Sequence, residues 1–380
     1  MRIAFVTCGL VRYTSLIANP MSEEQDVCFV GLDFRQEVAE GEEFSQAVRS
    51  WFDARIPTLV ASKWRKRDPR NLLAVWTAVR FLRQWRPDII HIQVDYDYRV
   101  YLTLAGLPHV PCVDTVHDAQ PHLGEYKTYS RKPDWRIRHL TRRHADQFIV
   151  HGEAIKNDFC REDKIALERA TVIPHPAYEF YCRFEESRIS QTHNEVLFFG
   201  RIWEYKGLDL LIQAEPLVSA AIPDVKFVIG GQGQDLGQYE AMMTHPERFE
   251  IHNRFLTDPE VTGLFQRAAL IVAPYREASQ SGVVMIAYAL GRPVIVTNVG
   301  SLAEVVRDGE TGLVIAPNDS MALAEAIVRL LRDHELRHRM GRSARALAHG
   351  ELSVESISKR TLQVYDSVLK RRKRSIGKAR

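Results

Sequence analysis

Short apolar runs alternate with amphipathic segments along most of the first half of the chain. The runs are rich in branched aliphatic residues and are bounded by polar or Gly positions, which is typical of buried strands. They lie at residues 3–7, 27–31, 88–94, 110–116, 145–150 and 170–173. Between them, residues 71–85 have apolar side chains at helical spacing, and Pro87 ends that helix. Such alternation predicts a parallel sheet with helices on both faces.

A second series of the same kind begins after a polar, irregular segment at 185–194, which we interpret as a linker. Strands are predicted at 196–200, 225–229, 270–274, 293–297 and 313–316, and helices at 320–332, 335–348 and 351–369. The pattern predicts an α/β protein of two Rossmann-like, doubly wound domains, 1–185 and 190–350. A final helix at 351–369 and a tail at 370–380 follow them.

Composition narrows the class of protein. The length of 380 residues suits two cores, and 45% hydrophobic with 26% charged residues is ordinary for a globular protein. No apolar run reaches the roughly 18 residues of a membrane span, and the start lacks a signal-peptide layout. The five cysteines are scattered without a CxxC pair, so neither a metal site nor a disulfide framework is expected. A cytoplasmic location is expected.

The basic residues are unevenly placed. Residues 370–380 contain seven Lys and Arg and no acid, so the rest of the chain is mildly acidic although the net charge is +3. Two further basic clusters lie at 63–67 and 131–143. The tail is either a solvated, partly disordered segment or one that an anionic membrane attracts, which would place the protein peripherally on the inner face of the membrane. No nucleic-acid motif accompanies these charges, so nucleic acid is not expected as a partner.

Two loops in the second half carry residues suited to phosphate. After the strand at 196–200, Gly200 is followed by Arg201 and Lys206, two cations five positions apart whose donors match phosphate oxygens. After the next strand, Gly231 and Gly233 would let the backbone approach a ligand closely. An ordinary charged surface loop and a simple turn are the alternative interpretations.

A short apolar helix is predicted to start at Ser281, its N-cap, and to end at Gly291. Its first N–H groups and its dipole would favour an anion, and Glu277 on the preceding loop could hold sugar hydroxyls. The alternative is a plain core helix with a capping Ser. Ser301 and Glu304 have the spacing of a capping box for another helix.

Taken in order, these residues resemble family-4 glycosyltransferases of the GT-B fold. The matching stretches are FGRIWEYKGLDLLI, FVIGGQG, APYREASQSGV and ALGRPVIVTNVGSLAEVVRDGETGLVIAPND, with weaker matches at TVHD, ADQFIVHGEAIK and TVIPHP. The resemblance covers most of the chain, is strongest over 195–320 and is weakest over 11–85.

The resemblance implies a retaining, metal-independent hexosyltransferase that moves a sugar from a nucleotide diphosphate sugar, with UDP or GDP as the expected nucleotide and no cofactor. Domain 1–185 would bind the acceptor, a glycan, glycolipid or small molecule, across a central cleft from the donor half. The catalytic residues would be Arg201, Lys206, Glu277 and His117. The donor would contact Gly9, Gly200, Gly231, Gly233, Arg254, Phe255, Gln280, Ser281, Gly282 and Val283. The final helix would cross back onto the first domain.

One departure concerns the ribose. The family pattern has a second glutamate eight positions after the first, where this chain has Met285, or Ile286 if the loop is one residue longer. Gln280 is a candidate substitute. The gap leaves open a nucleotide-sugar-binding protein that is inactive alone or depends on a partner. A nucleotide-sugar epimerase would need further acid and base carboxylates, and a dehydrogenase is disfavoured because no GxGxxG follows the first strand.

Overall fold

The computed structural model describes residues 1–32, 44–61, 64, 68–119, 134–187, 192, 194–233 and 236–378. The predicted basic clusters fall partly outside these residues. The described chain forms two compact units, one made of residues 1–119, 134–174 and 354–378, and the other of residues 175–353. We call them unit 1 and unit 2.

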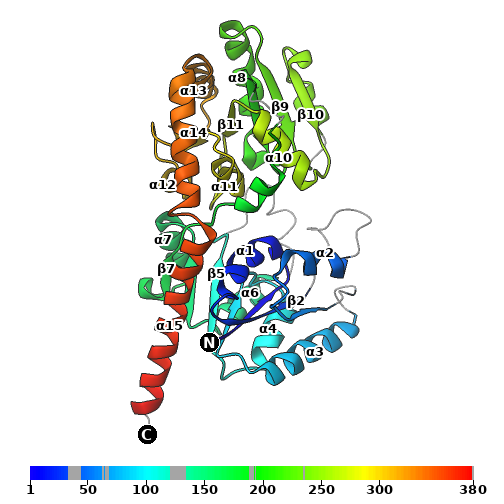
Figure 1. Cartoon of the computed structure of the whole chain (residues 1–380), viewed down its shortest axis with the longest axis vertical. Helices are drawn as coiled ribbons and strands as arrows, with labels where there is room; N and C mark the ends of the chain where they lie inside the picture. The colour runs from blue at the N-terminus through cyan, green and yellow to red at the C-terminus, as the bar shows by residue number, and fades with distance from the viewer. Residues whose placement is uncertain are drawn as a thin grey trace. The chain divides into compact units, whose positions relative to one another are not determined.

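Unit 1 is built on a seven-stranded sheet in which all neighbouring strands are parallel (Figure 1). Its strands are β1 (Arg2–Thr7), β2 (Asp26–Gly31), β3 (Thr58–Val60), β4 (Ile89–Ile92), β5 (Cys112–Val116), β6 (Gln147–Val150) and β7 (Ala170–Val172). They are ordered β3-β2-β1-β4-β5-β6-β7. The helices are α1 (Val11–Met21), α2 (Phe44–Trp51), α3 (Arg70–Trp85), α4 (Tyr98–Ala105), α6 (Asp134–Arg142), α7 (Glu153–Glu162) and α15 (Val354–Lys378).

Helices cover both faces of the unit 1 sheet, as the apolar runs require. Residues 3–6 of β1 are completely buried, because one face meets α1 and α15 and the other meets α3 and α4. On α15, Ile357, Tyr365 and Val368 pack into the first of these layers. The C-terminal helix is therefore part of the unit 1 core.

Unit 2 repeats the architecture with six parallel strands ordered β10-β9-β8-β11-β12-β13. The strands are β8 (Glu195–Phe199), β9 (Lys226–Gly230), β10 (Phe249–His252), β11 (Leu270–Ala273), β12 (Val294–Thr297) and β13 (Gly312–Ile315). The helices are α8 (Leu208–Ala221), α9 (Gly237–Glu240), α10 (Asp258–Arg267), α11 (Gly282–Ala289), α12 (Leu302–Val305), α13 (Ser320–Arg332) and α14 (His334–His349).

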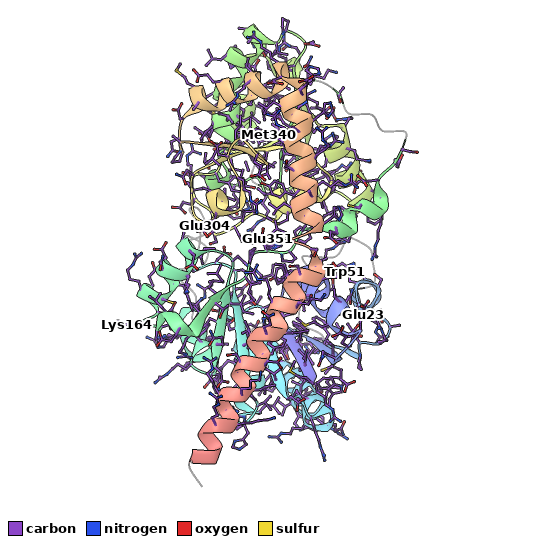
Figure 2. The ribbon with its side chains drawn as sticks, turned by 60° about the vertical axis from the view of Figure 1, so that its left-hand side comes forward. Glu23, Trp51, Lys164, Glu304, Met340 and Glu351 are labelled. Carbon is purple, nitrogen blue, oxygen red and sulfur yellow. The ribbon has the colours of Figure 1, made fainter. Side chains whose placement is uncertain are left out.

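Two apolar layers enclose the unit 2 sheet. Helices α8 and α13 pack on one face, where Met340 of α14 is also buried (Figure 2). Helices α10 and α11 pack on the other face together with further residues of α14. Because α11 contributes apolar side chains all round, it is buried in the middle of its layer.

The structure confirms the fold class, and it differs from the sequence prediction at two edge strands and at the end of the last helix, among other places. The sequence did not predict strands β3 and β10. Each is short and lies at a sheet edge, so its pairing depends on one neighbouring strand more than on its own residues. Helix α15 runs to Lys378 rather than ending at 369, so the described part of the tail is helical. In the part of the chain that the structure describes, we find no helix long and apolar enough to cross a membrane.

The described residues of the polar segment predicted as the linker, 185–187, 192 and 194, belong to unit 2, and the rest of that segment lies outside the described residues. The chain passes from one unit to the other between Pro174 and His175. The Ala177 N–H donates to the Leu352 carbonyl oxygen at 2.8 Å, and a 3₁₀ helix, Glu179–Phe184, packs against α10 and α11. The apolar contacts of this 3₁₀ helix hold the start of the predicted linker in unit 2. The polar composition of the linker did not indicate this.

Candidate active site

Most of the predicted site residues lie at one edge of the unit 2 sheet. Because neighbouring strands are parallel, their carboxyl ends meet at the same edge. Ligands bind beyond this edge in open α/β sheets. The loops that follow β8, β9, β10 and β11 hold every predicted residue of unit 2 up to the first turn of α11.

The two predicted cations converge on a pair of buried tyrosines. The Arg201 Nη2 atom lies 3.4 Å from the Tyr205 hydroxyl, and Lys206 Nζ lies 3.8 Å from the centroid of the Tyr275 ring. Burial raises the pKa of Tyr275 to about 12, so its hydroxyl stays protonated at neutral pH. That hydroxyl lies 3.2 Å from Ser281 Oγ. The tyrosines thus hold both cations beside the start of α11.

Arg276 fixes the loop after β11 to the loop after β8. Its guanidinium forms a two-pronged ion pair with the Asp209 carboxylate, at 2.7 and 2.5 Å. Its backbone N–H donates to the Tyr205 carbonyl oxygen at 2.8 Å, and Nη1 donates to the Glu204 carbonyl oxygen at 3.1 Å. The loop that carries Lys206 is therefore held in place before any ligand arrives.

The predicted glycines bring two loop backbones into direct contact. A methyl group added at Gly231 would lie 2.0 Å from the Gly200 carbonyl oxygen, and one at Gly233 would lie 2.3 Å from the Ile202 carbonyl oxygen. Gly231 also has a φ of 135°, which side chains rarely adopt. Glycine is required at these positions because the two loops pack closely against each other. The sequence alone could not distinguish this reason from the close approach of a ligand.

Helix α11 begins at Gly282, with Ser281 as its N-cap, as predicted. The Ser281 side chain makes no capping bond and instead contacts Tyr275, so the predicted capping role of its hydroxyl is wrong. The ring of Tyr178 lies against Gly282, 3.0 Å from where a Cβ atom would stand. The first N–H groups of a helix have no partner within the helix, which leaves them suited to an anion.

Two side-chain oxygen atoms close to the start of α11 are buried. Among the described residues, the buried Gln280 Oε1 and Ser301 Oγ atoms have no hydrogen-bond partner. The loops that carry them touch, since the Ser301 N–H donates to the Ser279 carbonyl oxygen at 3.3 Å. Ser301 is the N-cap residue of α12, but its hydroxyl makes no capping bond, so the predicted capping box is wrong. Glu277 is half-buried on the same loop as Gln280.

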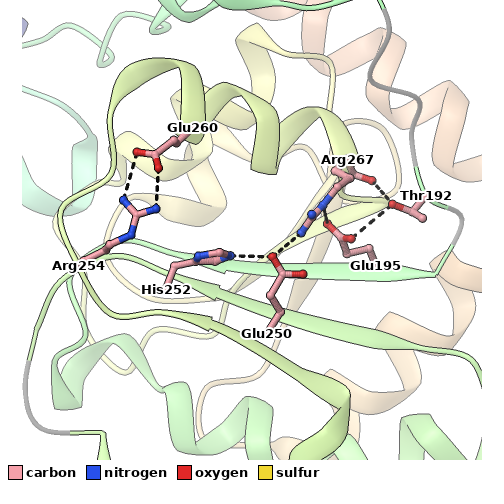
Figure 3. Close-up of polar contacts among 7 residues, drawn as sticks. All are labelled: Thr192, Glu195, Glu250, His252, Arg254, Glu260 and Arg267. Atoms are coloured by element: carbon pink, nitrogen blue, oxygen red, sulfur yellow. Dashed lines mark hydrogen bonds and ion pairs between the residues drawn. The ribbon is translucent and has the colours of Figure 1, made fainter.

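Arg254 and Phe255 follow the edge strand β10. The Arg254 guanidinium pairs with the Glu260 carboxylate of α10 at 2.6 Å (Figure 3). The hydrogen bond from Arg254 helps to lower the pKa of Glu260 to about 2, so this carboxylate is ionised at neutral pH. Phe255 is 44% exposed. Glu260 also accepts the Thr257 N–H at 2.8 Å, part of a capping box that the Thr-x-x-Glu spacing would have predicted.

Gly9 and His117 belong to unit 1, at the carboxyl edge of its sheet. The Gly9 N–H donates to Thr7 Oγ1 at 3.2 Å, directly after β1. His117 follows β5, with Nε2 3.0 Å from Gln93 Oε1 and Nδ1 3.3 Å from His151 Nε2. Gln93 and His151 follow β4 and β6, so three neighbouring strand ends supply one polar cluster.

The neighbours of His117 fix the orientation of its ring. His151 Nδ1 donates to the Ile173 carbonyl oxygen at 2.9 Å. Burial lowers the pKa of His151 to about 4, so its ring is neutral and its Nε2 atom accepts. The Tyr13 ring packs against His117 at a nearly perpendicular angle, with ring centroids 4.6 Å apart. The ring orientation of His117 is set by these contacts.

Two family models match this chain. Residues 9–177 match glycosyltransferase family 4, and residues 193–333 match glycosyl transferases group 1. Together they cover most of both units. The chain belongs to the family-4-like glycosyltransferases of the GT-B fold. It is therefore a glycosyltransferase.

Proteins similar to this chain align with between 46% and 97% of its length. A glycogen synthase of Mycobacterium tuberculosis is 27% identical over 74% of this chain and 69% of its own length. A phosphatidyl-myo-inositol mannosyltransferase of Mycobacterium leprae is 33% identical over 46% of each chain. HepE of Anabaena, solved in complexes with UDP and with UDP-glucose, shares the fold. In its UDP complex it has a TM-score of 0.74 and 18% identity, covering 97% of this chain and 100% of that one.

This glycosyltransferase has no carboxylate at the position of the second family glutamate. Met285 and Ile286 are only 2% and 6% exposed, and both pack in the apolar layer around α11. Neither side chain could hydrogen-bond a ribose. In contrast, the unpartnered Gln280 Oε1 atom lies on the loop just before α11.

Sequence reasoning missed several residues that support the site. Tyr205, Tyr275 and Arg276 lie within the quoted motifs, but their contacts depend on how two loops meet. Gln93 and His151 carried a usable signal, because each directly follows a predicted strand, as His117 does. Parallel topology brings such positions to one edge.

A buried charge cluster lies behind the unit 1 site. The Asp95 carboxylate accepts from Arg138 at 3.1 Å and also pairs with Arg142, which pairs with Asp163. Both carboxyl oxygens of Asp114 on β5 are buried with no hydrogen-bond partner among the described residues. Burial, and then the nearby Asp95, raise the pKa of Asp114 well above its ordinary value. Asp114 therefore keeps its proton to a higher pH in the folded protein than in the unfolded chain.

We expect Asp114→Asn to stabilise the protein increasingly as the pH rises. Asp114 keeps its proton in the folded state but loses it on unfolding above about pH 4, which favours unfolding. The stability difference from wild type should grow by about 1.4 kcal/mol per pH unit until Asp114 ionises when folded. Urea unfolding at pH 5, 6, 7 and 8 measures it. A difference that stays constant with pH would show that Asp114 is ionised in the folded protein.

Proposed function

We propose that this glycosyltransferase takes its sugar from a nucleotide diphosphate sugar bound at the carboxyl edge of the unit 2 sheet. The observation that carries the proposal is the convergence of Arg201 and Lys206 on Tyr205 and Tyr275, with the Tyr275 hydroxyl beside the N-cap of α11. Two cations and a helix N-terminus at one place form a site for two phosphate groups. UDP or GDP is the nucleotide we propose.

In this proposal the donor diphosphate meets the N–H groups at Ser281, Gly282 and Val283. Arg201 and Lys206 then stabilise the negative charge that develops on the leaving nucleotide diphosphate as the glycosidic bond breaks. Since both cations are already held by tyrosine contacts, little reorganisation is needed at that moment. We propose that they make the reaction independent of metal, so that EDTA leaves turnover unchanged.

Gln280 is our candidate for the ribose contact. Its buried Oε1 atom lacks a partner among the described residues, and an unpartnered buried acceptor is costly unless a ligand donates to it. A ribose hydroxyl is such a donor. We propose that Glu277 and His117 contact the transferred sugar, and that Arg254 and Phe255 border the base. Retention of the anomeric configuration, with a donor phosphate oxygen taking the acceptor proton, is part of the same proposal.

The acceptor is proposed to be a carbohydrate or lipid-linked molecule bound by unit 1. The name of the similar mannosyltransferase of Mycobacterium leprae includes a lipid, phosphatidyl-myo-inositol, and this supports a lipid-linked acceptor for the present chain. The basic end of α15 would hold the protein on the cytoplasmic face of an anionic membrane. Part of this end serves the fold, since Arg371 donates to Gln147 at 2.7 Å and Arg372 contacts the His109 carbonyl oxygen. Lys373 and Arg374 are exposed.

A second candidate function is nucleotide-sugar binding without turnover, or with turnover only beside a partner. The apolar Met285 and Ile286 in place of a carboxylate favour it. Turnover of a donor by the purified chain would exclude it.

A thermal-shift screen with UDP, GDP, ADP, CDP and dTDP tests the donor site. A nucleotide at 100 times its dissociation constant should stabilise the protein by about 2.7 kcal/mol. We expect one nucleotide to raise the melting temperature, with EDTA present, and Arg201→Ala to abolish the shift. No shift with any nucleotide, or an undiminished shift in Arg201→Ala, would contradict the proposed site.

A further inference from the structure

Helix α3 exposes large apolar side chains. Leu72, Leu73 and Trp76 are 57%, 63% and 58% exposed on its first two turns. The opposite side of the helix packs normally, with Ala78 and Leu82 completely buried. A helix that covers a sheet usually turns polar residues outward, so three large apolar residues on the outer face indicate a contact surface.

The last turns of the same outer face are basic. Arg80, Arg83 and Arg86 line a surface hollow together with Trp76 and Val79. The Arg80 guanidinium lies over the Trp76 ring at 5.3 Å. Residues 69–87 contain no Asp or Glu. We call Leu72, Leu73, Trp76, Arg80, Arg83 and Arg86 the α3 face.

The α3 face is continuous with the basic end of α15 through one loop of unit 1. Arg83 Nη2 donates to the Gly106 carbonyl oxygen at 3.0 Å, and Arg372 contacts the His109 carbonyl oxygen. The loop between α4 and β5 therefore lies between the two sets of cations. Together they form an extended basic surface on unit 1.

The direction of α3 sets where each part of its face lies. The helix follows β3 and precedes β4, so it runs from the carboxyl edge of the sheet to the amino edge. Leu72, Leu73 and Trp76 are near the carboxyl edge, where His117 also lies. The arginines are near the other edge. An apolar acceptor tail held at the α3 face would thus be on the side of unit 1 that carries His117.

We propose that the α3 face docks on an anionic phospholipid bilayer. Leucine and tryptophan side chains partition into the headgroup and acyl boundary, while arginines pair with lipid phosphates. A face without acids suits a surface that is uniformly negative. A second copy of this chain fits poorly, because a two-fold contact would bring the same arginines together. The inference deepens the membrane attachment proposed above for the end of α15, but it does not rest on sugar transfer, because vesicle binding needs no donor.

Sedimentation of the full chain with lipid vesicles tests the proposal. One set of vesicles contains phosphatidylcholine alone. The other also contains roughly 30% phosphatidylglycerol, whose anionic headgroups give the vesicle a negative surface potential. We expect binding only to the anionic vesicles. Arg80→Gln with Arg83→Gln should weaken the partition coefficient at least ~10-fold at low salt. Leu72→Ser with Trp76→Ser should weaken it at least ~10-fold at both low and high salt, since apolar partition is not screened.

Matched controls lie on other surfaces of the chain. Met321→Ser replaces an equally exposed apolar residue of unit 2, and Arg339→Gln with Arg342→Gln removes two exposed arginines of α14. These variants should bind vesicles as wild type does, and all variants should keep the wild-type melting temperature within a few degrees. Lys373→Gln with Arg374→Gln separates the α15 contribution.

Three outcomes would overturn the proposal. One is anionic vesicle binding that the α3 variants leave unchanged while the α15 variant abolishes it. Another is no vesicle binding by the wild type. The third is a wild-type dimer in light scattering that the α3 variants convert to monomer without any change in vesicle binding, which would make the α3 face a contact between copies. A nucleotide-binding failure in the thermal-shift screen would leave these results unaffected.

Discussion

Replacement of Arg201 by alanine is expected to lower turnover at least ~10²-fold, the usual effect of removing one preorganised group that stabilises transition-state charge. Lys206→Ala should have a similar effect. Both cations lie against tyrosines beside the start of α11, where the donor phosphates are proposed to bind. Because Arg201 is proposed to contact the donor phosphates before the bond breaks, and the charge on the leaving group grows as it breaks, the loss should appear as a lower kcat together with a higher KM.

Steady-state kinetics with the donor found by the nucleotide screen measure this effect. Lys226→Ala is the matched control, because Lys226 is exposed at the start of β9, on the opposite edge of the same sheet. That variant should retain the wild-type kcat. Near-normal turnover in both Arg201→Ala and Lys206→Ala would contradict the role assigned to this pair.

The second large effect is expected from Gly231→Ala. The new Cβ atom would lie 2.0 Å from the Gly200 carbonyl oxygen, and the backbone φ of 135° is strained for alanine. Strain and overpacking together should cost about 2–5 kcal/mol of unfolding free energy. Because Gly200 precedes Arg201, the displaced loop should also lose nucleotide affinity.

Gly309→Ala provides the control for Gly231→Ala. Gly309 has a positive φ of 74°, but an added methyl group would meet nothing within 4 Å. This variant should lose only about 1–2 kcal/mol, the cost of the left-handed backbone, and should bind nucleotide normally. Urea unfolding and calorimetric titration distinguish the two. Equal losses in both variants would mean that strain alone, and not contact between the loops, makes Gly231 necessary.

The fold could be predicted where burial sets the pattern. Residues 3–7 and 196–200 lie in central strands with both faces covered, so they appear in the sequence as continuous apolar runs. Thr58–Val60 and Phe249–His252 are edge strands, whose pairing depends on a neighbour more than on their own residues. The extent of α15 could not be predicted either, because contacts of Arg371 and Arg372 with unit 1 hold the basic segment in helical form.

The sequence could predict which loops form the candidate site, but it could not predict the contacts between their side chains. Arg201, Lys206 and Ser281 were recognised by residue type and position after strands, and parallel topology brings those positions to one edge. Their link through Tyr275 is a tertiary contact, for which a sequence pattern holds no signal. Ser281 and Ser301 fit capping patterns, yet the Ser281 hydroxyl contacts the Tyr275 hydroxyl, and the Ser301 hydroxyl has no hydrogen-bond partner among the described residues. Capping rules consider only residues close in the chain, so they cannot predict that a side chain will instead contact a residue outside the capping motif.

The most direct test of the central claim is a crystal structure of the protein with the nucleoside diphosphate identified in the screen. We predict that the diphosphate lies against the N–H groups of Gly282 and Val283, with Arg201 and Lys206 within hydrogen-bond distance of its oxygens. Gln280 Oε1 should accept from a ribose hydroxyl. A nucleotide bound elsewhere on the chain, or bound here without contact to Arg201 and Lys206, would contradict the account.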